Sequence, residues 1–297
     1  MVISTLLFVI VSAMAFVLPP SRLPRHVQVC SLAEPTLKLP ENLAGSIEFT
    51  EDVLKKHNAH LDLKKSSPET LVIHNCIEGE IILINIGPGC IEREIVEELV
   101  LMNEDIQVEY WHHERRLVLT CKLGSASAEG EGELFYQLYN WNEEYGLGSV
   151  YGGRGGFYFP DGSSESLFIP DASFITKDRK DKAVELLETD YSTLTALPQF
   201  VIELISNEKS IRNETEKMEN YMRLGVDLGW LIEPKAKTVT IYRKAPETLE
   251  GFTVTPPLNN PEALFDETGT ILPGFVMNMT KVFQKIDSVR NMRRKKE

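Results

Sequence analysis

The stretch Phe200-Val201-Ile202-Glu203-Leu204-Ile205 decides the fold. It is apolar on both faces, which is typical of a central strand that is covered on two sides. Yet an acid, Glu203, stands in its middle, and burying an ionised carboxylate is costly unless a partner offsets its charge. The stretch therefore predicts a sheet with covering layers, and it marks Glu203 as a residue whose position needs a cause.

A second acid stands out in the same way. Residues Leu167 to Ile175 form another apolar run, which we interpret as one strand, and Asp171 is its only acid. The neighbouring Pro170 indicates an edge or a bulge. A divalent cation between adjacent strands would explain both acids, because Mg²⁺ favours one or two carboxylates with water and substrate phosphates as further ligands. The alternative is that each acid lies at a strand end, exposed or paired with Arg or Lys, and the pattern alone leaves both readings open.

The residues that follow the predicted strand Phe200 to Ile205 indicate a helix and then another strand. Asn213 and Glu216 suggest a capping box, and Gly225 suits the left-handed position that ends a helix. Leu228 to Ile232 is the next apolar run, and Thr238 to Arg243 a further one. A strand, helix and strand with short turns form a βαβ unit, so part of the sheet should be parallel.

Upstream, the pattern predicts two more helices and a strand. Glu92 to Met102 is helical in period, Arg115 to Leu123 is typical of a strand, and Leu134 to Tyr145 has apolar residues at helical spacing. The run Gly152-Gly153-Arg154-Gly155-Gly156 is followed by no Gly-Lys-Ser/Thr, so it indicates a turn between strands and not a phosphate loop. The fold class is α/β or α+β, with a central mixed sheet flanked by helices.

Charge and composition restrict the functions that fit. The net charge of −13 argues against broad adhesion to phosphate backbones, which needs clustered Lys and Arg, so any nucleic-acid contact must be local. Residues 286–297 form a basic tail, which is either a solvated end or a phosphate-binding arm. The cysteines form no C-x-x-C pair and the histidines lack a matching ligand set, so a metal site would have to use carboxylates.

The N-terminus is typical of a targeting segment. Residues 1–15 are almost wholly apolar and end in Ala13-Met14-Ala15, which predicts a cleaved signal peptide and no stable membrane span after cleavage. Residues 16–45 form a presequence or linker that resembles the bipartite presequence of plastids of secondary origin. We therefore expect entry into the secretory route and a plastid location, with secretion as the alternative. Residues 46–114 are an N-terminal extension of unknown role.

Several blocks in a fixed order resemble a known family. They are Tyr139-Asn140-Trp141-Asn142, Gly146-Leu147-Gly148, Pro170-Asp171-Ala172-Ser173-Phe174, Val201 to Ser206, Glu216 to Tyr221, Gly225, Leu228 to Ile232, Val239 to Arg243 and Leu272-Pro273-Gly274-Phe275. Together they look like the Uma-two family, which is classed among the restriction endonucleases in the PD-(D/E)XK nuclease superfamily. The resemblance spans roughly Arg115 to Phe283, and it implies a restriction-endonuclease-like core, which we place at residues 115–285.

The resemblance also implies which residues carry the chemistry. Asp171 and Glu203 match the metal-binding acids, with Leu204 as a further metal-ligating position and Mg²⁺ or Mn²⁺ as the cofactor. The superfamily has a Lys two residues after the Glu, but Ile205 stands there in this chain. The family suggests Lys217 from the following helix instead, and the helical step lets it lean over the sheet. The alternative is that Lys217 is a solvated helix lysine paired with Glu214 or Tyr221.

A carboxylate from the first helix often completes such sites. Glu131 lies on the helical face of Leu138 and Tyr145, whereas Glu133 points away, so we expect Glu131 to be the catalytic acid of this helix.

The implied function is that of an endonuclease hydrolysing DNA phosphodiesters by metal-activated water, without a covalent intermediate. Two alternatives remain at this point: a catalytically silent nuclease-fold module for binding or assembly, and a hydrolase of smaller phosphate esters. The expected partner is nucleic acid, and DNA is the first expectation. A homodimer is a further hypothesis.

Overall fold

The predicted central strand is β12 (Phe200–Leu204) in the computed structural model, and all five of its residues are buried. It pairs antiparallel with β10 (Ala172–Thr176) and parallel with β13 (Leu228–Glu233). Helix α7 (Ile211–Leu224) joins β12 to β13. The predicted βαβ unit and the mixed sheet are therefore confirmed.

The structure describes residues 36–39, 60–61, 70–74, 81–85, 91–103, 106–120, 125–187 and 193–294. Residues 35–297 belong to one unit. Its seven-stranded sheet has the order β15-β14-β13-β12-β10-β7, with β16 paired to β14. The strands not yet given are β7 (Gly148–Gly152), β14 (Thr238–Lys244), β15 (Phe252–Val254) and β16 (Leu258–Asn259).

A six-stranded sheet of order β11-β8-β9-β5-β6-β4 lies in the same unit. Its strands are β4 (Ile81–Asn85), β5 (Gln107–Trp111), β6 (Arg116–Thr120), β8 (Phe157–Asp161), β9 (Ser164–Phe168) and β11 (Leu194–Thr195). The small sheets consist of β1 (Thr36–Lys38), β2 (His60–Leu61) and β3 (Thr70–His74), and of β17 (Ala263–Phe265) and β18 (Val276–Asn278).

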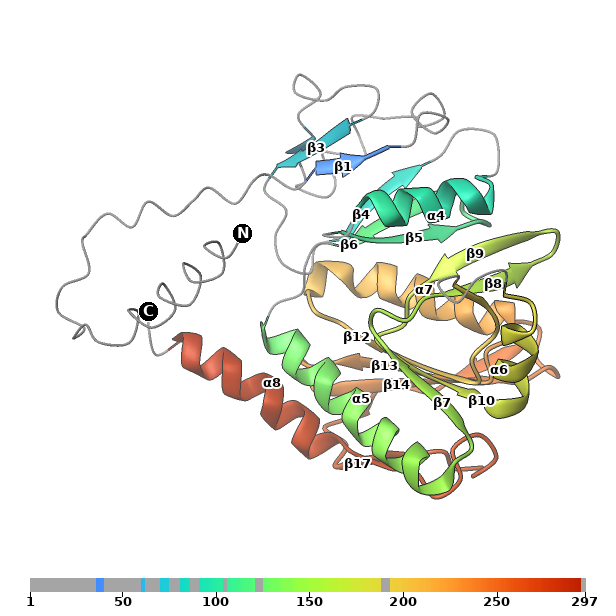
Figure 1. Cartoon of the computed structure of the whole chain (residues 1–297). Helices are drawn as coiled ribbons and strands as arrows, with labels where there is room; N and C mark the ends of the chain where they lie inside the picture. The colour runs from blue at the N-terminus through green and yellow to red at the C-terminus, as the bar shows by residue number, and fades with distance from the viewer. Residues whose placement is uncertain are drawn as a thin grey trace, which may run out of the picture. The chain divides into compact units, whose positions relative to one another are not determined.

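The helices form layers around the two large sheets. They are α4 (Arg93–Met102), α5 (Ser125–Tyr145), α6 (Lys177–Val184), α7 and α8 (Met279–Arg294), with a 3₁₀ turn η2 (Glu208–Ser210) before α7. Figure 1 shows α7 between the sheet of β5 and β6 and that of β12 to β14, with α5 and α8 together on the far side of the latter.

The alternating residues of β12 explain these layers. Phe200, Ile202 and Leu204 pack with α5 and α8 in one buried cluster. Val201 packs with α7 and with the aromatic residues of β8 and β9 in another. Because side chains alternate across a strand, Glu203 shares the side of Val201 and faces α7. The third cluster lies between α4 and the opposite face of the six-stranded sheet.

The single strand that we expected from Leu167 to Ile175 is wrong. It is divided between β9, in the six-stranded sheet, and β10, in the seven-stranded sheet. Pro170 lies at the division, and its missing N–H and fixed φ cannot continue a ladder. The chain thus passes from one sheet to the other immediately before Asp171, which begins the approach to β10.

The predicted capping box is also wrong, because α7 begins earlier. Ser210 is its N-cap residue, without a capping side-chain hydrogen bond, and Asn213 is buried inside the first turn. Glu216 pairs with Arg116 of β6 at 3.1 Å instead of reaching back to the helix start. The C-terminal end is confirmed: Gly225 ends the helix with a φ of 110°.

The other predicted elements are confirmed. The two upstream helices are α4 and α5, the strand near Arg115 is β6, and the glycine-rich run forms the turn between β7 and β8.

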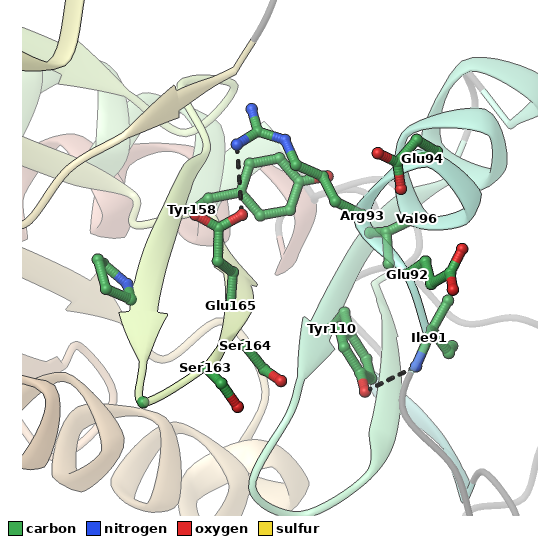
Figure 2. A pocket seen from close by; sticks show the side chains of 12 residues that line it. Ile91, Glu92, Arg93, Glu94, Val96, Tyr110, Tyr158, Ser163, Ser164 and Glu165 are labelled. Carbon is green, nitrogen blue, oxygen red and sulfur yellow. Dashed lines mark hydrogen bonds and ion pairs between the residues drawn. The ribbon is translucent and has the colours of Figure 1, made fainter. Parts of the chain in front are cut away.

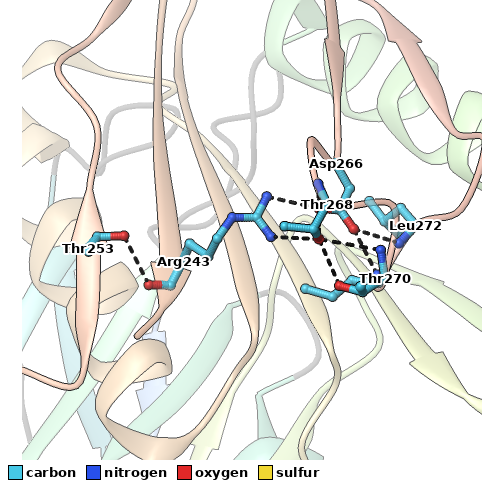
Figure 3. A network of polar contacts seen from close by, with 7 residues as sticks. Arg243, Thr253, Asp266, Thr268, Thr270 and Leu272 are labelled. Carbon is cyan, nitrogen blue, oxygen red and sulfur yellow. Dashed lines mark hydrogen bonds and ion pairs between the residues drawn. The ribbon is translucent and has the colours of Figure 1, made fainter. Parts of the chain in front are cut away.

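A polar network holds the loop after β17 against β14. Asp266, whose side chain is 0% exposed, pairs with Arg243 at 2.9 Å and accepts hydrogen bonds from the N–H groups of Ile271 and Leu272 (Figure 3). Burial opposes ionisation, but these donors and Thr268 outweigh it and lower the pKa of Asp266 to about 2. The loop is thereby fixed where Leu272 enters the core beside α5.

The predicted signal peptide at 1–15 lies outside the described residues, as do nearly all of the presequence at 16–45 and the last residues of the basic tail. They stay predictions, as does the boundary at residue 115. Strand β5, within the segment that we assigned to the extension, pairs with both β6 and β9. Among the described helices, none combines the length and the apolar character that a membrane crossing needs.

Candidate active site

Glu203 and Lys217 meet between β12 and α7. The Lys217 Nζ lies 3.0 Å from Glu203 Oε1, and the two side chains are 8% and 2% exposed. The Tyr221 hydroxyl, one helical turn after Lys217, donates to the same carboxylate oxygen at 2.8 Å. The lysine is therefore buried over the sheet and is not the solvated helix lysine of the alternative reading.

A third strand supplies a residue that the sequence reasoning missed. Glu109 of β5 places Oε1 2.7 Å from Lys217 Nζ. The same carboxylate accepts hydrogen bonds from Ile169 N–H at 2.9 Å and from the Trp111 indole at 3.0 Å. Lys217 also donates to the Ile169 carbonyl at 2.9 Å, so its three N–H bonds all have partners. Lys217 thus ties β5, β12 and the segment before Asp171 together.

Asp171 lies beside Glu203 because of the strand register. Ala172 of β10 pairs with Ile202 of β12, so the next residues along the antiparallel ladder, Asp171 and Glu203, face each other. Leu204 N–H donates to Asp171 Oδ2 at 2.6 Å. Ala172 also pairs with Gly152 of β7, which brings Gly153 to the other side of Asp171.

Glu131 of α5 reaches the same place from the first helix. A Cβ built at Gly153 would lie 3.4 Å from Glu131 Oε2 and 3.7 Å from Asp171 Cα. Glu131 Oε1 is buried and has no hydrogen-bond partner among the described residues. Glu133 instead pairs with Lys281 of α8 at 2.9 Å, so of the two acids only Glu131 approaches Asp171.

Burial dominates the electrostatics of these acids. It raises the pKa of Glu131 to about 9, with a further contribution from the charge of Asp171. It raises the pKa of Asp171 to about 6 and that of Glu203 well above its usual range, although Lys217 opposes both. Glu214, on α7, has its pKa raised to about 8 by burial as well.

The pKa of Lys217 is raised as well, but the neighbouring charges and not burial are the cause. Burial alone would lower its pKa, but the surrounding carboxylates, led by Glu109 and Glu203, raise it well above the usual value. One ammonium stands against five acids, namely Glu109, Glu131, Asp171, Glu203 and Glu214. The cluster has more carboxylates than a single lysine can neutralise, so further positive charge, as protons or a cation, is needed.

This donor set fits a divalent cation. Carboxylate oxygens are the ligands that Mg²⁺ and Mn²⁺ take, and the unpaired Glu131 Oε1 is an oxygen without another use. No three His, Cys, Asp or Glu side chains in the described ranges are already arranged around a common point. Mg²⁺ sites built from one or two carboxylates plus water and substrate do not require such a triplet.

The two residues that follow Glu203 in the chain, Leu204 and Ile205, have different surroundings. Leu204 has only main-chain atoms to offer a cation, and its N–H is engaged by Asp171. Ile205, which stands where the superfamily has a lysine, is 5% exposed and packs in the apolar cluster with Met218 and Tyr221. An ammonium at that position would be buried in this cluster, whereas Lys217 enters from the helix with acidic partners.

The comparison with known families is decisive for classification. Residues 94–277, more than half of the chain, match the family described as "Putative restriction endonuclease" (Uma2). The chain belongs to the Uma2 family. The resemblance that the sequence blocks indicated is thereby confirmed, and the Uma2 match begins upstream of β5, so that it includes Glu109.

Among solved structures, the Uma2 chain is similar to one titled "Crystal structure of a putative nuclease belonging to DUF820 from Anabaena variabilis ATCC 29413 at 1.96 A resolution". The identity is 18% and the TM-score 0.48, over 65% of this chain and 99% of that chain. The comparison with curated proteins gave no match.

A separate cavity of about 510 Å³ lies between the start of α4 and the β8–β9 hairpin of the Uma2 chain. Its cation, Arg93, lies over the Tyr158 ring at 4.1 Å and pairs with Glu165 at 3.3 Å (Figure 2). None of the predicted site residues lines it. The cavity and the acidic cluster are therefore distinct features.

The signal that finds Glu203 would also have found Glu109. Glu109 is the only charged residue of β5, in the run Gln107-Val108-Glu109-Tyr110-Trp111, and it is 2% exposed. We did not predict a strand there, so the buried acid was not recognised. Glu214 is harder to find, because an acid in the first turn of a helix is ordinary.

Proposed function

We propose that this Uma2 chain is an endonuclease that hydrolyses phosphodiester bonds of DNA with Mg²⁺ or Mn²⁺. One observation carries the proposal: Lys217 Nζ is buried 3.0 Å from Glu203 Oε1, inside a cluster of acids that includes Asp171. A buried carboxylate pair with an adjacent ammonium suits a reaction in which a phosphate group gains negative charge.

Asp171 and Glu203 would hold the cation, with Glu131 offering its unpaired oxygen. When bound, such a cation lowers the pKa of a coordinated water and offsets charge on the phosphorane. The chain's own residues prepare this place. Leu204 N–H orients Asp171, and the Tyr221 hydroxyl orients Glu203.

Lys217 has two tasks in this proposal. Its charge offsets part of the negative charge of the cluster, and its position beside Glu203 lets it act on the attacked phosphate. All three of its N–H bonds are engaged in the present arrangement. Release of any one of these partners would free an N–H of Lys217 for a phosphate oxygen or for the attacking water.

Cleavage by matched variants tests the proposal. The whole chain should nick supercoiled plasmid DNA with Mg²⁺ or Mn²⁺ and not with EDTA, and Asp171→Ala should abolish nicking. Glu131→Gln should lower the rate about tenfold to 100-fold, in the range of losses seen for groups that support a metal site. Glu133→Gln, two residues away on α5 but paired with Lys281, is the control and should keep the rate. Unchanged nicking by Asp171→Ala would reject this site.

One observation favours a second candidate, the catalytically silent binding module. Asp171 Oδ2 and Glu203 Oε1 already have protein partners, in Leu204 and Lys217, as a purely structural network would. A chain that binds DNA but never nicks it, with either cation, would support this candidate.

A further inference from the structure

A stripe of α5 runs from the acidic cluster along the end of β7. Glu131, Phe135 and Tyr139 follow at intervals of four residues, so they share one face of the helix. The rings of Phe135 and Tyr139 are stacked, with centroids 5.7 Å apart and an interplanar angle of 25°. Tyr139 is 42% exposed, and its hydroxyl has no partner among the described residues. Two aromatic rings therefore lead outward from the candidate metal site.

Glycines let this stripe approach β7 closely. A Cβ at Gly152 would lie 3.3 Å from the Phe135 ring, and one at Gly153 would lie 3.4 Å from Glu131 Oε2. The turn that follows is closed by a hydrogen bond of 2.7 Å from Gly155 N–H to the Gly152 carbonyl. Arg154 stands in this turn, next to the residue that borders Asp171 and Glu131.

Arg154 is one of a few described arginines without a neutralising carboxylate, and it stands next to Gly153 at the acidic cluster. Most described arginines are neutralised locally, as Arg116 is by Glu216 and Arg179 by Asp227. Arg154 is exposed and has no ion pair or hydrogen bond in the described part of the chain. A protein of net charge −13 needs such a local cation to hold a phosphate backbone.

We propose that Phe135, Tyr139 and Arg154 form a platform for an unpaired nucleic-acid strand that leads into the site, an inference that rests on the proposed function. Bases stack on the exposed face of Tyr139, and Arg154 binds a backbone phosphate. From Glu131 to Tyr139 the helix rises about 12 Å, which matches three or four nucleotides of a stacked strand. Aromatic stacking tolerates any base, so the platform selects an unpaired strand and not a sequence.

The platform predicts distinct effects for its two kinds of residue. Tyr139→Ala should weaken binding of a single strand of about 12 nucleotides by about fivefold or more, the value of one lost base stack. Tyr139→Phe should restore binding, because the ring remains. Arg154→Ala should reduce the slope of log binding constant against log salt concentration by about 0.7, the value for one phosphate contact on a single strand.

Matched residues provide the controls. Arg115 is an exposed arginine without an ion pair in the described ranges, in the turn between β5 and β6. Tyr136 is 54% exposed on the same helix but lies 5.3 Å from Lys281 of α8. Arg115→Ala and Tyr136→Ala should bind as the wild type does, with the same salt slope.

Fluorescence anisotropy with a labelled oligonucleotide, in EDTA so that no cleavage occurs, is the measurement. Wild-type binding in Tyr139→Ala and Arg154→Ala would overturn the platform, as would the absence of any binding by the wild-type chain. Equal losses on a blunt duplex and on a single strand would overturn the assignment to an unpaired strand. Nicking by the wild type together with unaltered binding in both variants would reject the platform and leave the proposed function standing.

Discussion

At the scale of single residues, Glu131 has two unusual properties. Its Oε1 has no hydrogen-bond partner among the described residues, and its pKa is strongly raised. Folding raises the pKa of this acid from 4.5 to about 9, chiefly through burial. An acid with a raised pKa binds its proton more tightly in the folded state than in the unfolded chain. The stabilisation from its protonated form is therefore complete below pH 4.5 and is lost as the pH rises through about 9.

This shift predicts a pH-dependent stability that a cation should reverse. In EDTA, the thermal unfolding temperature should fall as the pH rises from about 5 to 9, and Mg²⁺ should restore more of it at the alkaline end, because metal binding displaces protons from its ligands. Glu131→Gln should flatten the profile and reduce the response to Mg²⁺, while Glu133→Gln should follow the wild type. Calorimetry over this pH range makes the measurement, and parallel profiles for wild type and Glu131→Gln would contradict the assignment.

At the scale of elements, β7 places the glycine-rich turn beside Asp171. At the other end of β7, around Gly148, the main chains of β7 and β10 approach each other very closely. Gly148 pairs with Thr176, and a Cβ at Gly148 would lie 2.0 Å from the Ile175 carbonyl oxygen. A main-chain atom cannot move aside as a flexible side chain can. The register that brings Gly153 to the acidic cluster therefore depends on a missing side chain at the far end of the strand.

Gly148→Ala should destabilise the fold by about 1–3 kcal/mol, the usual cost of a forced backbone shift. Gly132→Ala should have the opposite effect and stabilise by about 1 kcal/mol, since nothing lies within 4 Å of its Cβ and alanine is the better helix former. Urea unfolding of the two variants measures both changes. Equal stability in Gly148→Ala and wild type would show that β7 is not held as closely as the structure has it.

At the scale of the whole molecule, the site is assembled from segments far apart in the chain. Glu109 comes from β5, Glu131 from α5, Glu203 from β12 and Lys217 from α7, and the ammonium contacts acids of both sheets. A buried ion pair contributes most visibly when one partner is removed, because the remaining charge has lost its counter-charge.

A double-mutant cycle tests this coupling. Lys217→Met should destabilise the fold by up to about 3 kcal/mol, because Glu109 and Glu203 lose their counter-charge, and Glu109→Gln should destabilise it less, because Lys217 keeps Glu203. The double variant should be more stable than the sum of the two effects predicts, by about 1 kcal/mol or more. Urea unfolding of the four proteins gives the coupling energy. Additive effects would mean that Glu109 and Lys217 do not act on each other in the folded chain.

The sequence allowed much of the architecture to be predicted. An apolar run interrupted only by Glu203 indicated β12. Gly225 indicated the end of the helix after it, and the next apolar run indicated the second strand of the βαβ unit. The family resemblance added Lys217, which no spacing from Glu203 would have singled out. Placing Glu131 and not Glu133 near Asp171 followed from the helical step alone.

Other features could not be predicted, for physical reasons. The division of the chain at Pro170 depends on two separate sheets, and a local pattern does not show to which sheet a residue belongs. Helix α7 begins at Ile211 without a side-chain cap, and Asn213, which the sequence suggested as the cap, is buried in its first turn. The buried acid Glu109 carried a local signal, but its place beside the segment before Asp171 required knowing that β5 adjoins β9, a contact that no short segment encodes.

The shared ammonium has a consequence for the newly made chain. Synthesis passes Glu109, Glu131, Asp171 and Glu203 before Lys217 and the strand that seats its helix leave the ribosome. Until then Glu109 and Glu203 lack the ammonium that contacts both of them in the folded chain. The buried acidic cluster can therefore form completely only after α7 and β13 have been made, which ties it to the late steps of folding.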